Sequence, residues 1–165
     1  MRNKTVFEQT EIVHGCMVHI VEQLEQFLNH YNVERLSLGN GGGPTQYEQQ
    51  VLKSLRRLEV FCDEAKDKLA RLLSAPVFRE SKAEKCLYGI YHQCISEFFL
   101  PKEESWYENS RAAYSSGPSI TFHHVPGPSL QELFASLETS FHFLRDVLDY
   151  YDMEYERKSS TKEKS

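Results

Sequence analysis

The 165-residue sequence has little of what several large functional classes require. Its formal net charge is −5, so it lacks the basic excess with which a protein binds the phosphate backbone of nucleic acids in general. It also lacks any run near the roughly 20 apolar residues of a membrane-spanning helix. Glu8 and Glu11 fall where a secretory signal would have its apolar centre. We therefore expect a cytoplasmic protein that has neither nucleic acid in general nor a membrane as its partner.

Cysteine is scarce, and no two of the four cysteines form a Cys-x-x-Cys pair. Cys16, Cys62 and Cys94 fall on apolar stripes of the expected helices, where a free thiol behaves as a small hydrophobic side chain. This arrangement favours packing in a reducing compartment over a disulfide framework or a zinc site.

Motifs for catalysis and metal binding are missing as well. The seven histidines form no His-Glu-x-x-His motif, and the adjacent His123 and His124 would point to opposite faces of a strand. A di-iron site in a helical bundle needs Glu-x-x-His on two helices, which this chain does not have. No nucleophile elbow or triad signature is present either. We expect no catalytic residue, no metal and no other cofactor.

One signal precedes an amphipathic run four times, namely a hydroxyl residue three positions before a glutamate. These capping boxes begin at Thr5, Thr45, Ser81 and Ser129, each ahead of apolar residues at helical spacing. They predict helices over about 6–36, 46 to about 73, 82–100 and 130 to about 156. The second of these alternates apolar steps of three and four residues, which is typical of packing between nearly antiparallel neighbours.

The fold class expected from this pattern is mainly α, a four-helix antiparallel bundle. Its core positions, helix by helix, are expected to be Val13, Met17, Ile20, Leu24, Phe27, Leu28 and Tyr31, then Val51, Leu55, Leu58, Cys62, Ala65, Leu69 and Leu72, then Ala83, Leu87, Ile90, Tyr91, Cys94, Ile95 and Phe98, and finally Leu130, Leu133, Phe134, Leu137, Phe141, Leu144, Leu148 and Tyr151. A single domain is expected over 1–157, followed by a disordered tail over 158–165, which has no apolar residue.

The segment 102–127 differs from the helices around it. Two short runs of aromatic and β-branched residues flank a Ser-Ser-Gly-Pro turn, which predicts a β-hairpin inserted between the third and fourth helices. An isolated two-stranded hairpin is marginal in water, so this one must pack on the helices. We expect Trp106, Tyr114, Ile120 and Phe122 to make that contact.

The hairpin also carries the residues best suited to binding. Trp106, Tyr107, Glu108 and Arg111 lie close together, and Trp, Tyr and Arg dominate interface hot spots. The plainer interpretation is a structural clip, in which the aromatics are buried and Arg111 pairs with a helix carboxylate. A basic spot on the second helix, formed by residues 53–57, is open to the same two interpretations, a solvated face or an anion site.

Tyr88 and His92 lie one helical turn apart on the third helix and are candidates for the same site. The first functional hypothesis is a small non-catalytic interaction or regulatory module, with Tyr107, Arg111 and His92 on the surface that meets a protein partner. The alternative is a small-molecule-binding protein or unrecognised enzyme with a pocket between hairpin and bundle. A homodimer through the first or last helix is a third interpretation, because Phe143 lies outside the apolar stripe.

Several short motifs between residues 52 and 122 carry a family resemblance. They are Leu55-Arg-Arg-Leu58, Ala83-Glu-Lys85, Ile90-Tyr-His-Gln-Cys94, Glu97-Phe-Phe99 and Trp106-Tyr-Glu108. In these motifs the chain resembles the YpuI-like family, small proteins of unknown function from Bacillus and its relatives. The resemblance implies a bacterial, soluble, intracellular protein with no known reaction, cofactor or ligand, and it carries over no catalytic residue.

Overall fold

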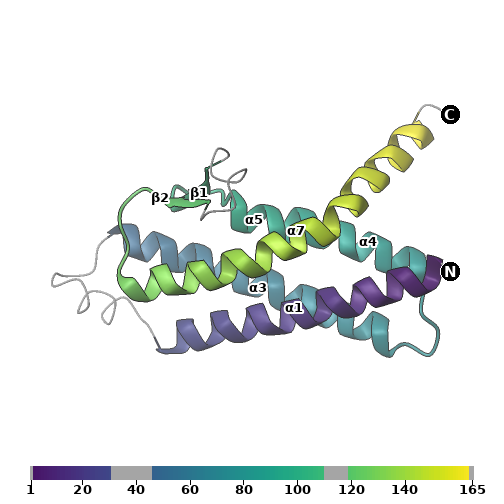
Figure 1. Ribbon diagram of the computed structural model, residues 1–165, viewed down its shortest axis with the longest axis horizontal. Coiled ribbons are helices and arrows are strands. Elements are labelled where there is room, and N and C mark those ends of the chain that lie inside the picture. Colours follow the sequence, from purple (N-terminus) through teal and green to yellow (C-terminus); the bar gives the residue numbers. More distant parts are fainter. Residues whose placement is uncertain (1, 31–45, 110–118, 164–165) are drawn as a thin grey trace.

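The computed structural model describes residues 2–30, 46–109 and 119–163, with side chains described from Thr5 to Tyr151 within these ranges. The helices are α1 (Arg2–His30), α3 (Gln46–Ser74), α4 (Glu80–Ile90), the π-helical turn η1 (Tyr91–Ile95), α5 (Ser96–Phe99) and α7 (Pro128–Glu163), and the strands are β1 (Trp106–Glu108) and β2 (Ile120–Phe122). The helical segment from α4 to α5 is continuous, so four long rods lie side by side with alternating direction (Figure 1). The predicted antiparallel four-helix bundle with an inserted hairpin is confirmed.

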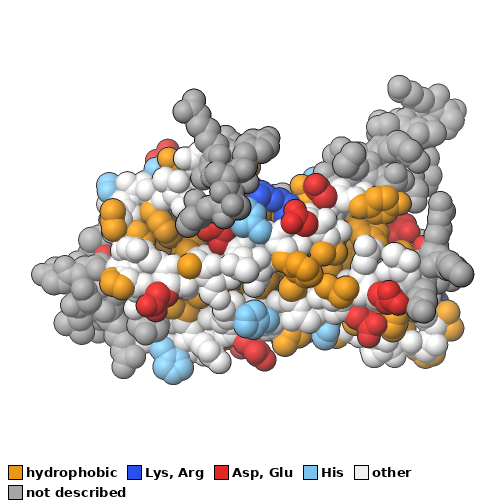
Figure 2. Space-filling view, viewed as in Figure 1, with side chains coloured by type: hydrophobic (Ala, Val, Ile, Leu, Met, Phe, Trp, Pro, Cys, Tyr) orange, Lys and Arg blue, Asp and Glu red, His pale blue; other side chains and the backbone are white. Residues whose placement is uncertain are grey.

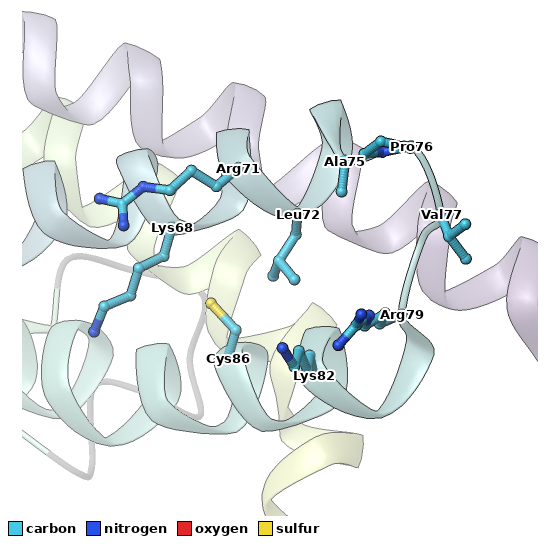
Figure 3. Close-up of a pocket in the computed structure, with 9 residues that line it drawn as sticks. All are labelled: Lys68, Arg71, Leu72, Ala75, Pro76, Val77, Arg79, Lys82 and Cys86. Atoms are coloured by element: carbon cyan, nitrogen blue, oxygen red, sulfur yellow. The ribbon is translucent and has the colours of Figure 1, made fainter.

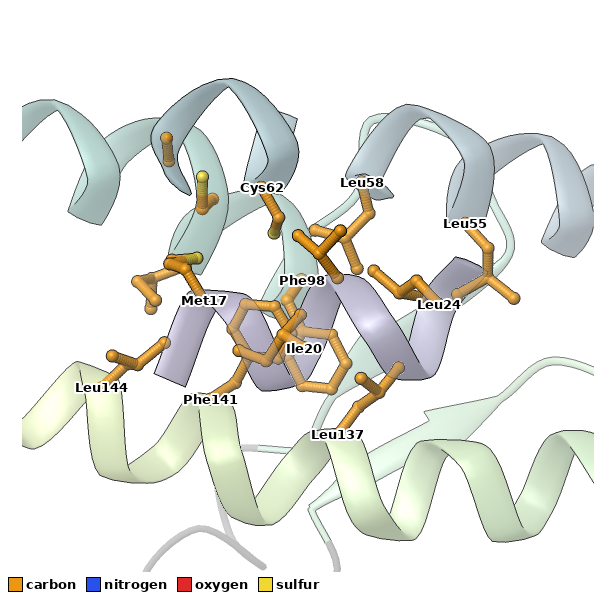
Figure 4. Close-up of a cluster of buried hydrophobic side chains, with 14 of the residues drawn as sticks. Met17, Ile20, Leu24, Leu55, Leu58, Cys62, Phe98, Leu137, Phe141 and Leu144 are labelled. Atoms are coloured by element: carbon orange, nitrogen blue, oxygen red, sulfur yellow. The ribbon is translucent and has the colours of Figure 1, made fainter. Parts of the chain in front are cut away.

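The core lies along the axis of the bundle and receives side chains from all four rods (Figure 4). Every predicted core position that the structure describes is buried or partly buried, whereas Tyr31 lies outside the described residues. Near the middle, the rings of Phe98 and Phe141 stack at 4.2 Å between centroids, which joins the third rod to the fourth. Burial at this spacing explains why the apolar periodicity alone predicts the fold.

The four cysteines are free thiols, as the sequence predicts. Cys62 and Cys94 are completely buried between α3 and η1. The hydrogen bond with Cys94, together with burial, raises the pKa of the Cys62 thiol well above its usual value. The Cys62 side chain therefore packs as a small neutral group at neutral pH.

The helix starts differ from the predicted caps. α4 begins at Glu80 after Arg79, which makes no side-chain cap bond, so Ser81 lies inside the first turn. α7 begins at Pro128, and the Gln131 N–H donates to the Gly127 carbonyl at 3.2 Å. Proline is favoured at the first helical position because it lacks an N–H and its φ is already helical, so it overrides the Ser129 signal. Similarly, Thr5 lies within α1, whereas Thr45 lies outside the described residues.

The end of the last helix also differs from the prediction. α7 continues to Glu163, beyond its predicted end near residue 156 (Figure 1). The division into a domain over 1–157 and a disordered tail over 158–165 stays a prediction. None of the described helices is both long enough and apolar enough to cross a membrane.

The hairpin pairs β1 with β2 in antiparallel register. Trp106 lies opposite Phe122, Tyr107 opposite Thr121, and Glu108 opposite Ile120. Alternate residues face opposite sides of a strand, so Trp106 and Glu108 share the side that faces the helices and Tyr107 takes the other. The rings of Trp106 and Phe122 lie 4.7 and 4.8 Å from that of Phe134 on α7. The predicted packing of the hairpin through Trp106, Ile120 and Phe122 agrees with these contacts, and Tyr114 lies outside the described residues.

Candidate functional site

Trp106 anchors the inner side of the hairpin. Only 2% of its surface is exposed, and its indole N–H donates to the Phe98 carbonyl at 2.6 Å. A buried indole with its one donor satisfied contributes to packing. Of the predicted site residues, Trp106 therefore lies in the core, where little of its surface is open to a partner.

Glu108 lies on the same inner side and forms an ion pair with α7. Arg145 places Nη1 2.9 Å from Glu108 Oε1 and Nη2 2.8 Å from Oε2, so the two groups meet through both pairs of atoms. The guanidinium also lies 3.9 Å from the centre of the Phe99 ring. Burial works to lower the pKa of Arg145, but the hydrogen bond and charge of Glu108 raise it overall. Arg145 thus stays charged and holds the hairpin between α5 and α7.

A hydrogen-bond chain continues from Arg145 to the start of β2. The Ser119 N–H and hydroxyl both donate to Glu138 Oε1, the hydroxyl at 2.6 Å. His142 places Nε2 3.1 Å from the Ser119 hydroxyl oxygen and 3.3 Å from Glu138 Oε1. Its other nitrogen, Nδ1, lies 3.0 Å from Arg145 Nη2. Hairpin and helix are therefore joined by a chain of side-chain hydrogen bonds and an ion pair.

The direction of these bonds shows what this chain can do chemically. A guanidinium only donates, so His142 Nδ1 accepts and the ring proton resides on Nε2, facing Ser119. A histidine that activates a serine must accept the hydroxyl proton at that nitrogen. The carboxylate of Glu138 also lies on the Nε2 side rather than behind the ring. The set has the composition of a triad but the geometry of a structural network.

The other end of the hairpin is attached to α3. The Tyr47 hydroxyl donates to the Ser105 carbonyl and accepts from the His123 N–H at 3.1 Å. Burial raises the pKa of Tyr47, against the lowering effect of backbone hydrogen bonds from His124 and His123, so the phenol keeps its proton. Nearby, Arg57 and Lys53 lie 3.1 and 3.8 Å from Glu103. Part of the basic spot over 53–57 is thus neutralised by the segment that leads into β1.

The outer side of the hairpin is exposed and aromatic. Tyr107 is 40% exposed, and its ring lies 5.2 Å from that of His123. The His124 ring lies 4.8 Å from Tyr47, edge to face. A hollow of about 560 Å³ opens beside these rings, and its lining residues are Gln46, Tyr47, Gln50, Glu104, His123 and His124. We call this the ring surface, made of Tyr107, His123, His124 and Tyr47.

The remaining predicted site residues lie elsewhere. Tyr88 and His92 are in contact, with ring centroids 4.5 Å apart, where α4 meets η1. Arg111 lies outside the described residues. Among the residues that the structure does describe, no three His, Cys, Asp or Glu side chains are grouped so as to hold a metal ion.

The network residues on α7 were not predicted from the sequence, although they carry a signal. Glu138, His142 and Arg145 are spaced by four and three residues, which places three polar groups on one helix face. Their partners, Ser119 and Glu108, come from the two strands, and no local pattern pairs them with α7. Of the ring surface, Tyr107 was a candidate from the sequence, whereas His123, His124 and Tyr47 were missed for the same reason, because Tyr47 belongs to a helix far away in the sequence.

Comparison with known proteins places the chain among uncharacterised relatives. A family model described as "Protein of unknown function (DUF3907)" matches residues 10–157. A protein of Bacillus subtilis (strain 168), described as uncharacterized protein YpuI, is 36% identical over 156 residues, which cover 92% of this chain and 84% of that protein. No solved structure matches the chain.

Proposed function

We propose that this chain, which belongs to the DUF3907 family of proteins of unknown function, is a small non-catalytic module that binds a protein partner through its ring surface. The observation that carries the proposal is a group of rings, with exposed Tyr107 beside exposed His123 and exposed His124 beside half-buried Tyr47, next to a hollow of about 560 Å³. Tyrosine supplies a large contact area with a polar end and few rotatable bonds, which makes it frequent among hot spots.

The attachment of the hairpin supports this proposal. Its inner side is fixed by Trp106 and by the ion pair of Glu108 with Arg145, and its open end is fixed by Tyr47. A surface held in place before binding loses less conformational entropy when the partner arrives. The Ser119–His142 bond, which runs in the wrong direction for nucleophile activation, supports a non-catalytic role.

We place the module in the cytoplasm, because its four cysteines are free. Two of them, Cys62 and Cys94, lie close enough to form a hydrogen bond and would be prone to oxidation in a compartment that forms disulfides.

Site-specific photocrosslinking tests the partner surface. A photoreactive phenylalanine analogue replaces Tyr107 in one variant and Val60, an exposed apolar side chain on α3 outside every proposed surface, in the matched control. We expect a discrete crosslinked partner from position 107 in living cells, absent from position 60 and reduced when His124→Ala is added. Equal labelling from both positions, or labelling at 107 that His124→Ala leaves unchanged, contradicts the proposal. A product with the mass of two copies of this chain assigns the surface to a homodimer.

A second candidate function is favoured by the hollow itself, which lies between hairpin and bundle. Its lining by Gln46, Gln50, Glu104 and two histidines suits a small polar ligand that forms hydrogen bonds. A thermal-shift screen distinguishes the two functions. A polar metabolite that raises the melting temperature of the wild type, but not that of Gln50→Ala, supports the small-molecule function.

Association through α7 or α1 is a separate proposal. Phe143, Tyr150 and Ile12 are 48%, 61% and 47% exposed. The face over α1 and α7 shows apolar side chains in patches between acidic ones (Figure 2). Sedimentation of the wild type and of Phe143→Ser measures the self-association of each. A wild type that is as monomeric as the variant contradicts this proposal.

A further inference from the structure

A second surface lies at the opposite end of α3, where the chain turns into α4. There a groove of about 600 Å³ is lined by four cations and five apolar or weakly polar residues, namely Lys68, Arg71, Arg79 and Lys82 with Leu72, Ala75, Pro76, Val77 and Cys86. None of the residues that line the groove carries a carboxylate. We call it the cationic groove.

The cations reach the groove from both of its walls (Figure 3). Lys68 extends from α3 toward α4, while Lys82 comes from α4 and Arg79 from the position just before α4. Leu72 and Cys86 point into the space between the two helices. Burial raises the pKa of the Cys86 thiol, and the positive charge of Lys68 acts in the opposite direction. The groove therefore combines an apolar floor with positive charge on both sides.

These cations differ from others in the described part of the molecule. Arg145, Arg57 and Lys66 each have a carboxylate within 3.1 Å. No such ion pair joins Arg79 or Lys82 to a carboxylate among the described residues. Like charges that line one groove repel, and this groove gathers four cations within a chain whose net charge is −5.

The carboxylates of α4 act on a different neighbour. Burial raises the pKa of Tyr151 to about 12, and the negative charges of Glu84 and Glu80 add to this effect. These two groups thus lie on the side of α4 that faces α7, while Lys82, and Arg79 just before the helix, line the groove beside α3. α4 separates its charges between two faces and leaves the positive face over the groove.

The turn that closes the groove is held by aromatic packing. Phe78, between Val77 and Arg79, meets Phe7 of α1 edge to face, with centroids 5.0 Å apart. This contact fixes the segment between α3 and α4 on which Arg79 and Val77 reside. Val77 itself is 70% exposed, so an apolar side chain at the edge of the groove is open to a ligand.

We propose that the cationic groove binds a small organic anion that carries two or more negative charges next to an apolar group, the chemistry of an aryl phosphate. The volume of about 600 Å³ is that of a small-ligand site. Cations on both walls suit a group with several anionic oxygens, and Leu72, Val77 and Cys86 suit its apolar part. The groove shares no residue with the ring surface, so each proposal stands or fails without the other.

Titration calorimetry of the full chain at low ionic strength tests the proposal with two probes, 1-naphthyl phosphate and inorganic phosphate. We expect naphthyl phosphate to bind about tenfold more tightly, because only it fills the apolar part. In Arg79→Gln/Lys82→Gln its affinity falls by about tenfold or more. The matched control, Arg56→Gln/Lys102→Gln, removes two exposed charges outside the groove and keeps the affinity.

A third variant tests the apolar part alone. Val77→Ser at the exposed edge weakens naphthyl phosphate and leaves inorganic phosphate unchanged. The proposal is overturned if neither probe binds at about 10 mM, if both bind equally, or if the control loses as much affinity as the groove variant. Vesicles that contain phosphatidic acid present the same chemistry on a lipid. Stronger binding to the vesicles than to naphthyl phosphate overturns the assignment to a free small molecule.

Discussion

The network between hairpin and α7 and the cationic groove both bring charged side chains together, yet they do so in opposite ways. In the network, Arg145 meets Glu108 at 2.8 Å, and Glu138 accepts from Ser119 and lies 3.3 Å from His142. In the groove, Arg79, Lys82 and Lys68 line one hollow with no carboxylate in the lining. In the network the cations are paired with carboxylates. In the groove the lining offers the cations no carboxylate partner.

This difference indicates which charged side chains stabilise the fold and which are available to bind a ligand. A partly buried group whose partner is removed loses its compensation and destabilises the fold. A surface cation that repels its neighbours contributes little or nothing to stability. Substitutions should therefore be costly in the hairpin network and nearly neutral in the groove.

The largest effect is expected where the hairpin enters the core. Trp106→Ala removes a ring that is 2% exposed and should cost about 3–5 kcal/mol in the free energy of unfolding. Tyr107→Ala, on the other side of the same strand, should change it by only about 0.5 kcal/mol. Urea denaturation measures both. Equal costs would mean that the hairpin does not pack on the helices through Trp106.

The ion pair of the network comes next. Arg145→Ala should cost about 1–3 kcal/mol, less than a fully buried pair, because about a quarter of the Arg145 side chain is exposed. The double variant with Glu108→Ala should recover part of this loss, because no carboxylate is left without its partner. A double-mutant cycle by denaturation gives the coupling energy. A coupling of zero would contradict the role of this pair in holding the hairpin.

A smaller effect is expected at the serines. Ser119→Ala removes one donor to the buried Glu138 and should cost about 1–2 kcal/mol. Ser81→Ala is the matched control, because Ser81 lies in the first turn of α4 and is exposed. It should cost less than about 0.5 kcal/mol, where a capping serine would cost about 1 kcal/mol. Thermal unfolding distinguishes these outcomes. A cost of about 1 kcal/mol at Ser81 would show that this serine caps α4 after all.

The smallest effect is expected in the groove. Arg79→Gln/Lys82→Gln should leave the stability unchanged or raise it by about 0.5 kcal/mol, since repulsion is relieved and no ion pair is lost. Added salt should reduce any gain by screening the remaining charges. Denaturation at low and high ionic strength measures this change. A loss above about 1 kcal/mol would show that these cations have structural partners.

The sequence predicts the rods and the hairpin because their signals are local. The alternation of three and four residues from Val51 to Leu69 requires a buried helix face wherever it packs. The helix starts are harder to predict from the sequence, because Pro128 and Ser129 both signal a start. Only the backbone shows that α7 begins at Pro128. Periodicity gives no information on which capping signal is used.

The candidate sites depend on pairs that are distant in the sequence. Glu138, His142 and Arg145 share a helix face, which alone would suggest a solvated surface. They form a structural network only because Ser119 and Glu108 lie opposite them. Lys68 and Lys82 are ordinary surface residues in the sequence and become one groove only when the turn brings α4 back along α3. Such sites require the tertiary structure, since no spacing rule links their parts.

The contrast between satisfied and unsatisfied charges is tested most directly by an NMR titration of the uniformly ¹⁵N-labelled chain with 1-naphthyl phosphate. The account predicts amide shift changes concentrated over residues 68–86, with the strand amides of residues 106–108 and 120–122 unmoved. Changes concentrated instead on the hairpin, or on α7 around His142 and Arg145, would contradict it.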